Sequence, residues 1–86
     1  VVVDGGSTDD GPRIAEAHPK VRRIGQAGAG FADAWNCGIA ASSGAFVAFL
    51  DADDRWLPDK LARQMAMFER APELQYVYGK VQFFLE

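Results

Sequence analysis

Short apolar runs alternate along the chain with longer amphipathic stretches, and the runs predict strands. Val1–Val3 are β-branched and lead at once into a polar turn at residues 4–7, which predicts a fully buried strand that ends in a tight turn. Ala45–Leu50 is apolar on both faces and ends abruptly in acidic residues, so we expect a second buried strand there. Residues 21–24 and 75–85 also have strand character, the latter with an internal glycine.

Three stretches between these runs predict helices. Pro12 suits the first turn of a short helix that His18-Pro19 ends. A second helix has apolar residues at helical spacing, namely Phe31, Ala34, Trp35, Gly38 and Ile39. Pro58 opens a third helix, whose apolar stripe is formed by Leu57, Leu61, Met65 and Phe68. Strands that alternate with helices predict an α/β fold with a parallel sheet covered on both faces.

Composition and charge exclude several classes of protein. The 86 residues are 49% hydrophobic and 24% charged, which is typical of a globular chain with one domain at most. The net charge of −3 argues against nucleic-acid binding, and the single cysteine excludes an internal disulfide. Since the longest apolar run falls far short of the roughly 20 residues that span a bilayer, we expect no membrane segment in this chain. We therefore expect a cytoplasmic protein, with membrane association of a full-length form left open.

Polar clusters follow two of the predicted buried strands. The first comprises residues 4–7 and the second Asp51, Asp53 and Asp54. In open parallel sheets the ligand crevice lies beyond the carboxyl ends of the strands. We therefore expect both clusters to open on one edge of the sheet and to share a site.

Metal binding is the favoured interpretation of the second cluster. Three carboxylates in four residues repel one another unless a cation lies among them. Mg²⁺ is usually held by one or two carboxylates and completed by phosphates and water, which fits Asp51 and Asp53. For Asp54, a turn or a helix cap is an equal alternative. Asp4 has a similar alternative, because Asp-Gly-Gly-Ser is ordinary turn chemistry.

The remaining polar residues carry weaker signals. Gly5 and Gly6 allow a ligand to approach the backbone closely, and Ser7 offers a hydrogen-bond donor. A dinucleotide fingerprint at Gly28 and Gly30 is rejected, because Asp33 stands where the third glycine is needed.

Three motifs together resemble a family 2 glycosyltransferase with the GT-A fold. They are Val2-Val3-Asp4-Gly5-Gly6-Ser7-Thr8-Asp9, Ala34-Trp35-Asn36-Cys37-Gly38-Ile39, and the stretch from Phe49 through Asp51-Ala52-Asp53-Asp54-Arg55-Trp56 to Leu61. Their order and spacing agree with the family over essentially the whole chain. The resemblance implies an enzyme that transfers a sugar from a nucleotide-diphospho-sugar with inversion of the anomeric centre.

The resemblance also implies roles for single residues. Asp51-Ala52-Asp53 would be the family's Asp-x-Asp motif, with Asp53 as the principal ligand of Mg²⁺ or Mn²⁺ and Asp51 reaching the ribose or the metal. Asp4 and its turn would hold the nucleobase side of the donor. The candidate substrate-binding residues are Asp4, Gly6, Ser7, Asp33, Asn36 and Asp51.

The resemblance further implies that residues 1–86 are part of a donor-binding domain. Such a partial GT-A (Rossmann-like) domain has a mostly parallel sheet flanked by helices and lacks the first strand and the C-terminal acceptor half. The general base is then expected downstream of Glu86, and the fragment alone is expected to be inactive. The expected partners are a nucleotide-sugar donor, with UDP-sugars weakly preferred, and a saccharide or lipid-linked acceptor in polysaccharide or glycoconjugate biosynthesis.

The chain departs from the family at several positions. Gly5 replaces an acidic residue that many members have, and an acidic residue near Gly28 and a lysine near Cys37 are missing. Two alternative functions stay open. One is a Mg²⁺-dependent phosphoryl-transfer domain, which also places aspartates at strand ends but uses a nearby threonine or lysine that this sequence lacks. The other is a non-catalytic nucleotide-binding module.

Overall fold

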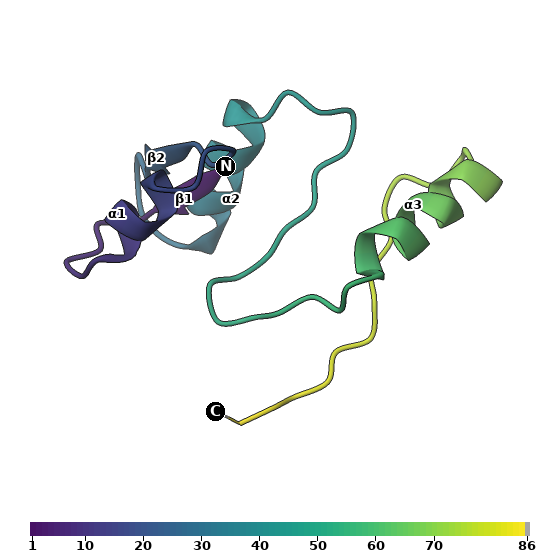
Figure 1. The fold of residues 1–86 in the computed structure, drawn as a ribbon. Helices are drawn as coiled ribbons and strands as arrows, with labels where there is room; N and C mark the ends of the chain where they lie inside the picture. Colours follow the sequence, from purple (N-terminus) through teal and green to yellow (C-terminus); the bar gives the residue numbers. More distant parts are fainter. Residues whose placement is uncertain (86) are drawn as a thin grey trace. The chain divides into compact units, whose positions relative to one another are not determined.

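The computed structural model of the chain describes residues 1–85. These residues form two compact units, of which one spans Val1–Phe49 and the other begins at Leu50. The elements in chain order are β1 (Val2–Asp4), α1 (Gly11–Glu16), β2 (Arg23–Gly25), α2 (Phe31–Ala41) and α3 (Lys60–Arg70) (Figure 1).

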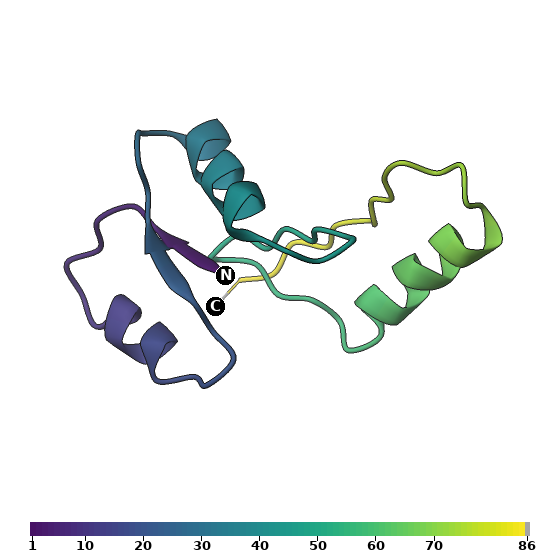
Figure 2. The ribbon, with the colours of Figure 1, turned by 90° about the horizontal axis from the view of Figure 1, so that it is seen from above.

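A parallel pair of strands organises the first unit. Val2 lies opposite Arg23 and Asp4 opposite Gly25 in the register of β1 and β2. The pair is extended at both ends by hydrogen bonds from the Val2 amide to the Arg22 carbonyl and from the Gln26 amide to the Asp4 carbonyl, each 2.8 Å long. The strands lie between α1, which contacts β2, and α2, which contacts β1 (Figure 2). This arrangement confirms the predicted α/β class with a parallel sheet flanked by helices.

The first helix forms where Pro12 and the acidic residues before it predict one. The Asp9 carboxylate accepts a hydrogen bond of 2.9 Å from the Gly11 amide, and Pro12 lies in the first turn. The helix ends at Glu16, and His18 lies exposed in the turn that follows. The prediction that His18-Pro19 ends this helix is confirmed.

The second helix packs closely on the first strand. The position of a Cβ atom at Gly38 lies 3.4 Å from Cγ2 of Val3, which shows how closely the helix backbone approaches the strand. Trp35, on the same apolar stripe, stacks on Phe49 with the ring centroids 4.8 Å apart. The helix ends at Ala41, and the Ser42 hydroxyl donates a 2.7 Å hydrogen bond to the Gly38 carbonyl. Ala34 and Gly38 of the predicted stripe are half-buried, whereas Phe31, Trp35 and Ile39 are exposed, so the apolar stripe covers the strand only in part.

In the second unit, α3 is the one regular element among the described residues. It begins after Asp59, and the Lys60 ammonium lies 4.1 Å from the centroid of the Trp56 ring. This cation–π contact places Trp56 at the start of the helix. The side-chain amide of Gln64, within α3, donates a 3.5 Å hydrogen bond to the carbonyl of Val77, which lies beyond the end of the helix.

Two of the predicted strands are absent from the described residues. Neither Ala45–Leu50 nor residues 75–85 form a strand, and the sheet contains only β1 and β2. A strand depends on a ladder of backbone hydrogen bonds to a neighbouring strand, and among the described residues such pairing joins β1 and β2 only. The strand predictions for these two segments are therefore wrong for this structure.

The predicted full burial of Val1–Val3 and of Ala45–Leu50 is also wrong. Among the described residues none is fully buried, and Val1, Val2, Phe46 and Leu50 are exposed. A pair of three-residue strands flanked by two helices offers too few layers to cover apolar side chains on both faces. No helix among the described residues is long and apolar enough to cross a membrane.

Candidate functional site

Asp4 lies at the carboxyl end of β1, and the protein holds both of its carboxylate oxygens. Oδ1 accepts a hydrogen bond of 3.1 Å from the Ser7 amide, and Oδ2 lies 3.2 Å from Nη1 of Arg23. Only 12% of the Asp4 side chain is exposed. The interpretation of Asp4 as a residue that stabilises a turn is therefore correct. The carboxylate can still accept further hydrogen bonds, since each of its oxygens can accept two.

These contacts keep Asp4 ionised. The pKa of the Asp4 carboxyl is lowered below its ordinary value of 3.8, mainly because the Ser7 hydrogen bonds stabilise the charged form. Arg23 and the Gly6 amide act in the same direction, and partial burial opposes them. A lowered pKa means that this interaction stabilises the fold above the ordinary pKa and is lost as the pH falls through the lowered one.

The turn after Asp4 exposes its backbone. Gly6 has φ of +97°, a conformation that L side chains rarely adopt, and no atom lies within 4 Å of the position of a Cβ there. Ser7 beside it is exposed. The backbone at Gly6 is therefore open to close approach, as the sequence predicts.

Asp33 secures the loop that precedes α2. Its Oδ2 accepts a 2.8 Å hydrogen bond from the Gly28 amide and lies 3.8 Å from Sγ of Cys37. The Gln26 side-chain amide donates a 2.9 Å hydrogen bond to the Gly30 carbonyl across the same loop. The structure thus gives Asp33 a loop-holding role, which the sequence did not predict.

Asn36, another predicted substrate-binding residue, lies exposed on α2.

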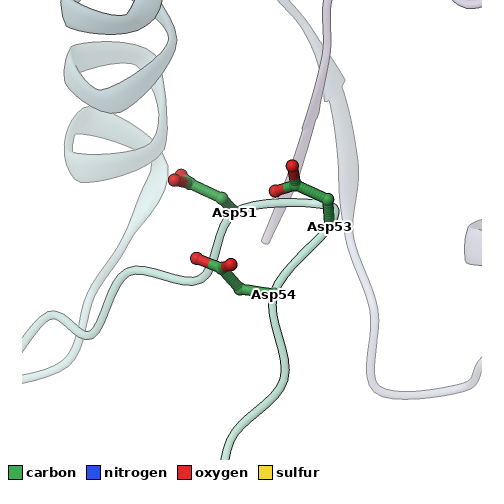
Figure 3. Close-up of side chains that lie close together, drawn as sticks. All are labelled: Asp51, Asp53 and Asp54. Atoms are coloured by element: carbon green, nitrogen blue, oxygen red, sulfur yellow. The ribbon is translucent and has the colours of Figure 1, made fainter. Parts of the chain in front are cut away.

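The acidic residues after Leu50 form one cluster, which we call the acidic turn and define as Asp51, Asp53 and Asp54. The Asp54 amide donates a 3.1 Å hydrogen bond to the Asp51 carbonyl, which closes a tight turn. Figure 3 shows the three side chains gathered on it, and one carboxylate oxygen of each lies within 4.8 Å of the others. All three are exposed. The three aspartates that the sequence groups in one polar cluster therefore lie close together in the structure.

The donor set of the acidic turn fits a hard divalent cation. Its ligands are carboxylate oxygens only, the type that Mg²⁺ and Mn²⁺ take in proteins. Within the described part of the chain, the three side chains have no hydrogen-bond or ion-pair partner. The chemistry of the cluster therefore suits a cation, which would relieve the mutual repulsion of the carboxylates.

Sequence reasoning missed Arg23 and Glu16. Arg23 lies 2.7 Å from Glu16, through its Nε, and 3.2 Å from Asp4. The position of Arg23 within a strand predicted to pack in a sheet could have indicated that its side chain has an acidic partner. Its partners could not be named without the register of β1 and β2.

Comparison with known families gives one match over the whole chain. The family described as "Glycosyl transferase family 2" matches residues 1–86 of this chain. The parallel strands and flanking helices of the first unit are consistent with part of a GT-A (Rossmann-like) fold. No solved structure matches the chain.

Curated relatives agree with this assignment. The chain is 45% identical over 74 residues to an uncharacterized glycosyltransferase of Nostoc sp., covering 80% of this chain and 23% of that protein. It is 38% identical over 77 residues to a putative teichuronic acid biosynthesis glycosyltransferase of Bacillus subtilis, covering 83% and 31%. It is 35% identical over 81 residues to a chondroitin synthase of Escherichia coli, covering 90% and 12%. The chain thus spans less than a third of each of these relatives, and it belongs to glycosyl transferase family 2.

Proposed function

We propose that this chain is the donor-binding part of an inverting, metal-dependent glycosyltransferase that uses a nucleotide-diphospho-sugar. The observation that carries the proposal is the family match over residues 1–86 together with the convergent oxygens of the acidic turn. Family membership favours sugar transfer over the alternative of phosphoryl transfer. Residues 1–86 would form the donor-binding domain, and the general base would lie downstream of Glu86.

The acidic turn is proposed to bind the diphosphate of the donor through a cation. Asp53 would be the principal ligand, and Asp51 would reach the cation or the ribose. When bound, Mg²⁺ or Mn²⁺ would neutralise charge that builds on the diphosphate leaving group. The exposure of the three carboxylates and the short separation of their oxygens support this role, because oxygens that lie close together and open to solvent can be reached by a cation and by the phosphates of a donor.

Asp4 is proposed to bind the nucleobase side of the donor. Its ionised carboxylate is held in place and can still accept a hydrogen bond from a base N–H group. The open backbone at Gly6 and the exposed Ser7 would allow a base or ribose to lie close to the turn. Asp33 and Asn36 complete the proposed substrate-binding set, Asp33 by shaping the loop before α2.

The names of relatives guide the choice of donor and acceptor. One Escherichia coli relative, 38% identical over 53 residues, is named a UDP-Glc:alpha-D-GlcNAc-diphosphoundecaprenol beta-1,3-glucosyltransferase. Two others are named for teichuronic acid biosynthesis and as a chondroitin synthase. We therefore propose a UDP-sugar as donor and a saccharide or lipid-linked saccharide as acceptor, in polysaccharide or glycoconjugate biosynthesis.

The proposal is tested with the full-length protein and a panel of nucleotide sugars. Release of the nucleoside diphosphate is measured with saccharide and lipid-linked acceptors, with Mn²⁺, with Mg²⁺ and with a chelator. We expect release from UDP-sugars that depends on acceptor and metal, and an inverted anomeric configuration in the product. Nucleotide binding without turnover for any acceptor would favour the non-catalytic alternative. Release that a chelator leaves unchanged would contradict the metal-dependent proposal.

A further inference from the structure

Arg23 connects three elements of the first unit. From β2 it reaches Asp4 at the end of β1 through Nη1, at 3.2 Å, and Glu16 at the end of α1 through Nε, at 2.7 Å. The Arg23 side chain is 30% exposed, whereas that of Glu16 is 56% exposed. The guanidinium is planar, so contacts through two of its nitrogens fix the orientation of the whole group.

The strand register explains why Arg23 meets Asp4. Arg23 lies opposite Val2, and Asp4 follows Val2 by two residues on the same strand. Side chains two residues apart point to the same face of a sheet. Arg23 therefore reaches Asp4 diagonally across the pair, a distance that a long side chain spans.

The Asp4 carboxylate is held from two sides. The turn that follows it contributes the Ser7 amide, which binds Oδ1, and the Gly6 amide, whereas Arg23 binds Oδ2 from the neighbouring strand. Removal of Arg23 would leave the carboxylate held by its own turn alone. Arg23 is thus the contact that fixes the carboxylate relative to β2.

We propose that Arg23 is a positioning residue that holds the Asp4 carboxylate in one orientation for the nucleobase of the donor, with Glu16 holding Arg23 in turn. This proposal rests on the proposed function, in which Asp4 binds the nucleobase side. It extends that function to two residues that have no part in the acidic turn. Arg23 acts through Asp4 and needs no contact with the donor itself.

The test measures binding of UDP and of inorganic pyrophosphate to the full-length protein in the presence of Mn²⁺. Arg23→Met should weaken UDP binding by about tenfold and leave pyrophosphate binding unchanged, because only the nucleobase end loses its positioned acceptor. Arg23→Lys should restore UDP binding only in part, since lysine keeps the charge but not the planar fork. Arg13→Met is the matched control, because Arg13 is paired with Asp10 on the exposed surface of α1.

A double-mutant cycle separates positioning from a general effect on folding. Asp4→Asn combined with Arg23→Met should bind UDP no more weakly than Asp4→Asn alone, because the arginine acts only through Asp4. Additive losses, an unchanged Arg23→Met variant, or equal losses for UDP and pyrophosphate would overturn the proposal. If Arg23→Met does not fold, the Glu16→Gln variant is used in its place. We expect it to weaken UDP binding by about twofold to threefold, and unchanged UDP binding would overturn the proposal.

The outcome for the unmodified protein distinguishes the two proposals. If it binds no UDP with Mn²⁺, the proposed function fails and the positioning role fails with it. If it binds UDP and the Arg23 variants bind equally well, only the positioning role is overturned.

Discussion

The two acidic regions of this chain differ in what surrounds their carboxylates. Asp4 is mostly covered and accepts contacts from Ser7 and Arg23, whereas the acidic turn exposes three carboxylates that have no protein partner among the described residues. The first carboxylate is oriented by the protein itself. The acidic turn brings carboxylate oxygens to within 4.8 Å of one another without such contacts from the protein.

The difference predicts that substitutions in the two regions have different consequences. In the acidic turn, a change should affect metal response and turnover. At Asp4 and its turn, a change should affect nucleotide recognition and local stability.

The largest effect is expected from Asp53→Asn in the full-length protein. Loss of one charged oxygen ligand should lower kcat/KM on the order of 100-fold and raise the Mn²⁺ concentration needed for half activity. Steady-state assays over a Mn²⁺ series measure both. Asp59→Asn is the control, because Asp59 is an exposed carboxylate before α3, paired with Arg63 at 3.8 Å and outside the acidic turn. Equal activity of the two variants would contradict a metal role for Asp53.

Asp4→Asn should act on the nucleotide with little change in metal response. The amide keeps the shape of the side chain but loses the charge that Arg23 and a base N–H group would meet. We expect UDP binding to weaken by about tenfold, with an unchanged Mn²⁺ requirement. A shift in the Mn²⁺ requirement as large as that of Asp53→Asn would remove the distinction between the two regions.

Gly6→Ala should destabilise the fold through its backbone. At φ of +97° an alanine is strained although its Cβ meets no neighbour, and the expected cost is about 1 kcal/mol in the free energy of unfolding. Gly25→Ala is a matched control, since Gly25 also has open space at its Cβ position and no positive φ. Denaturant unfolding of the full-length protein measures both, and equal stability of the two variants would contradict the argument.

The smallest effect concerns the titration of Asp4. Its carboxyl pKa should lie below 3.8, because the Ser7 hydrogen bonds and Arg23 favour the charged form. The contribution of Asp4 to the free energy of unfolding should be complete above pH 3.8 and should decrease as the pH falls through the lowered pKa. Carboxyl chemical shifts from NMR, recorded against pH, give the midpoint directly. Arg23→Met should move the midpoint upward, and an unperturbed midpoint in the unmodified protein would contradict the contacts.

Local sequence signals predicted the helices and the first strand well. Pro12, the apolar stripe around Trp35 and the stretch after Pro58 each mark a helix that the structure contains. These signals depend on residues close in sequence, such as caps and helical spacing. The convergence of the acidic turn was predictable for the same reason, because its members lie within four residues of one another.

The predictions that were wrong or missing concern contacts between residues far apart in the sequence. Ala45–Leu50 has the composition of a buried strand, but pairing and burial require neighbours that a local pattern does not name. The Arg23 contact with Asp4 was missed because it joins residues 19 apart through the register of two strands. Nothing in the local sequence of either residue specifies that register.

Isothermal calorimetry of the full-length protein with UDP, in the presence and absence of Mn²⁺, most directly asks whether the aspartate trio beyond Leu50 links a cation to a nucleoside diphosphate. We expect heat of UDP binding that is large with Mn²⁺, much weaker without it, and abolished by the double substitution Asp51→Asn and Asp53→Asn. Binding of equal affinity under all of these conditions would contradict this expectation.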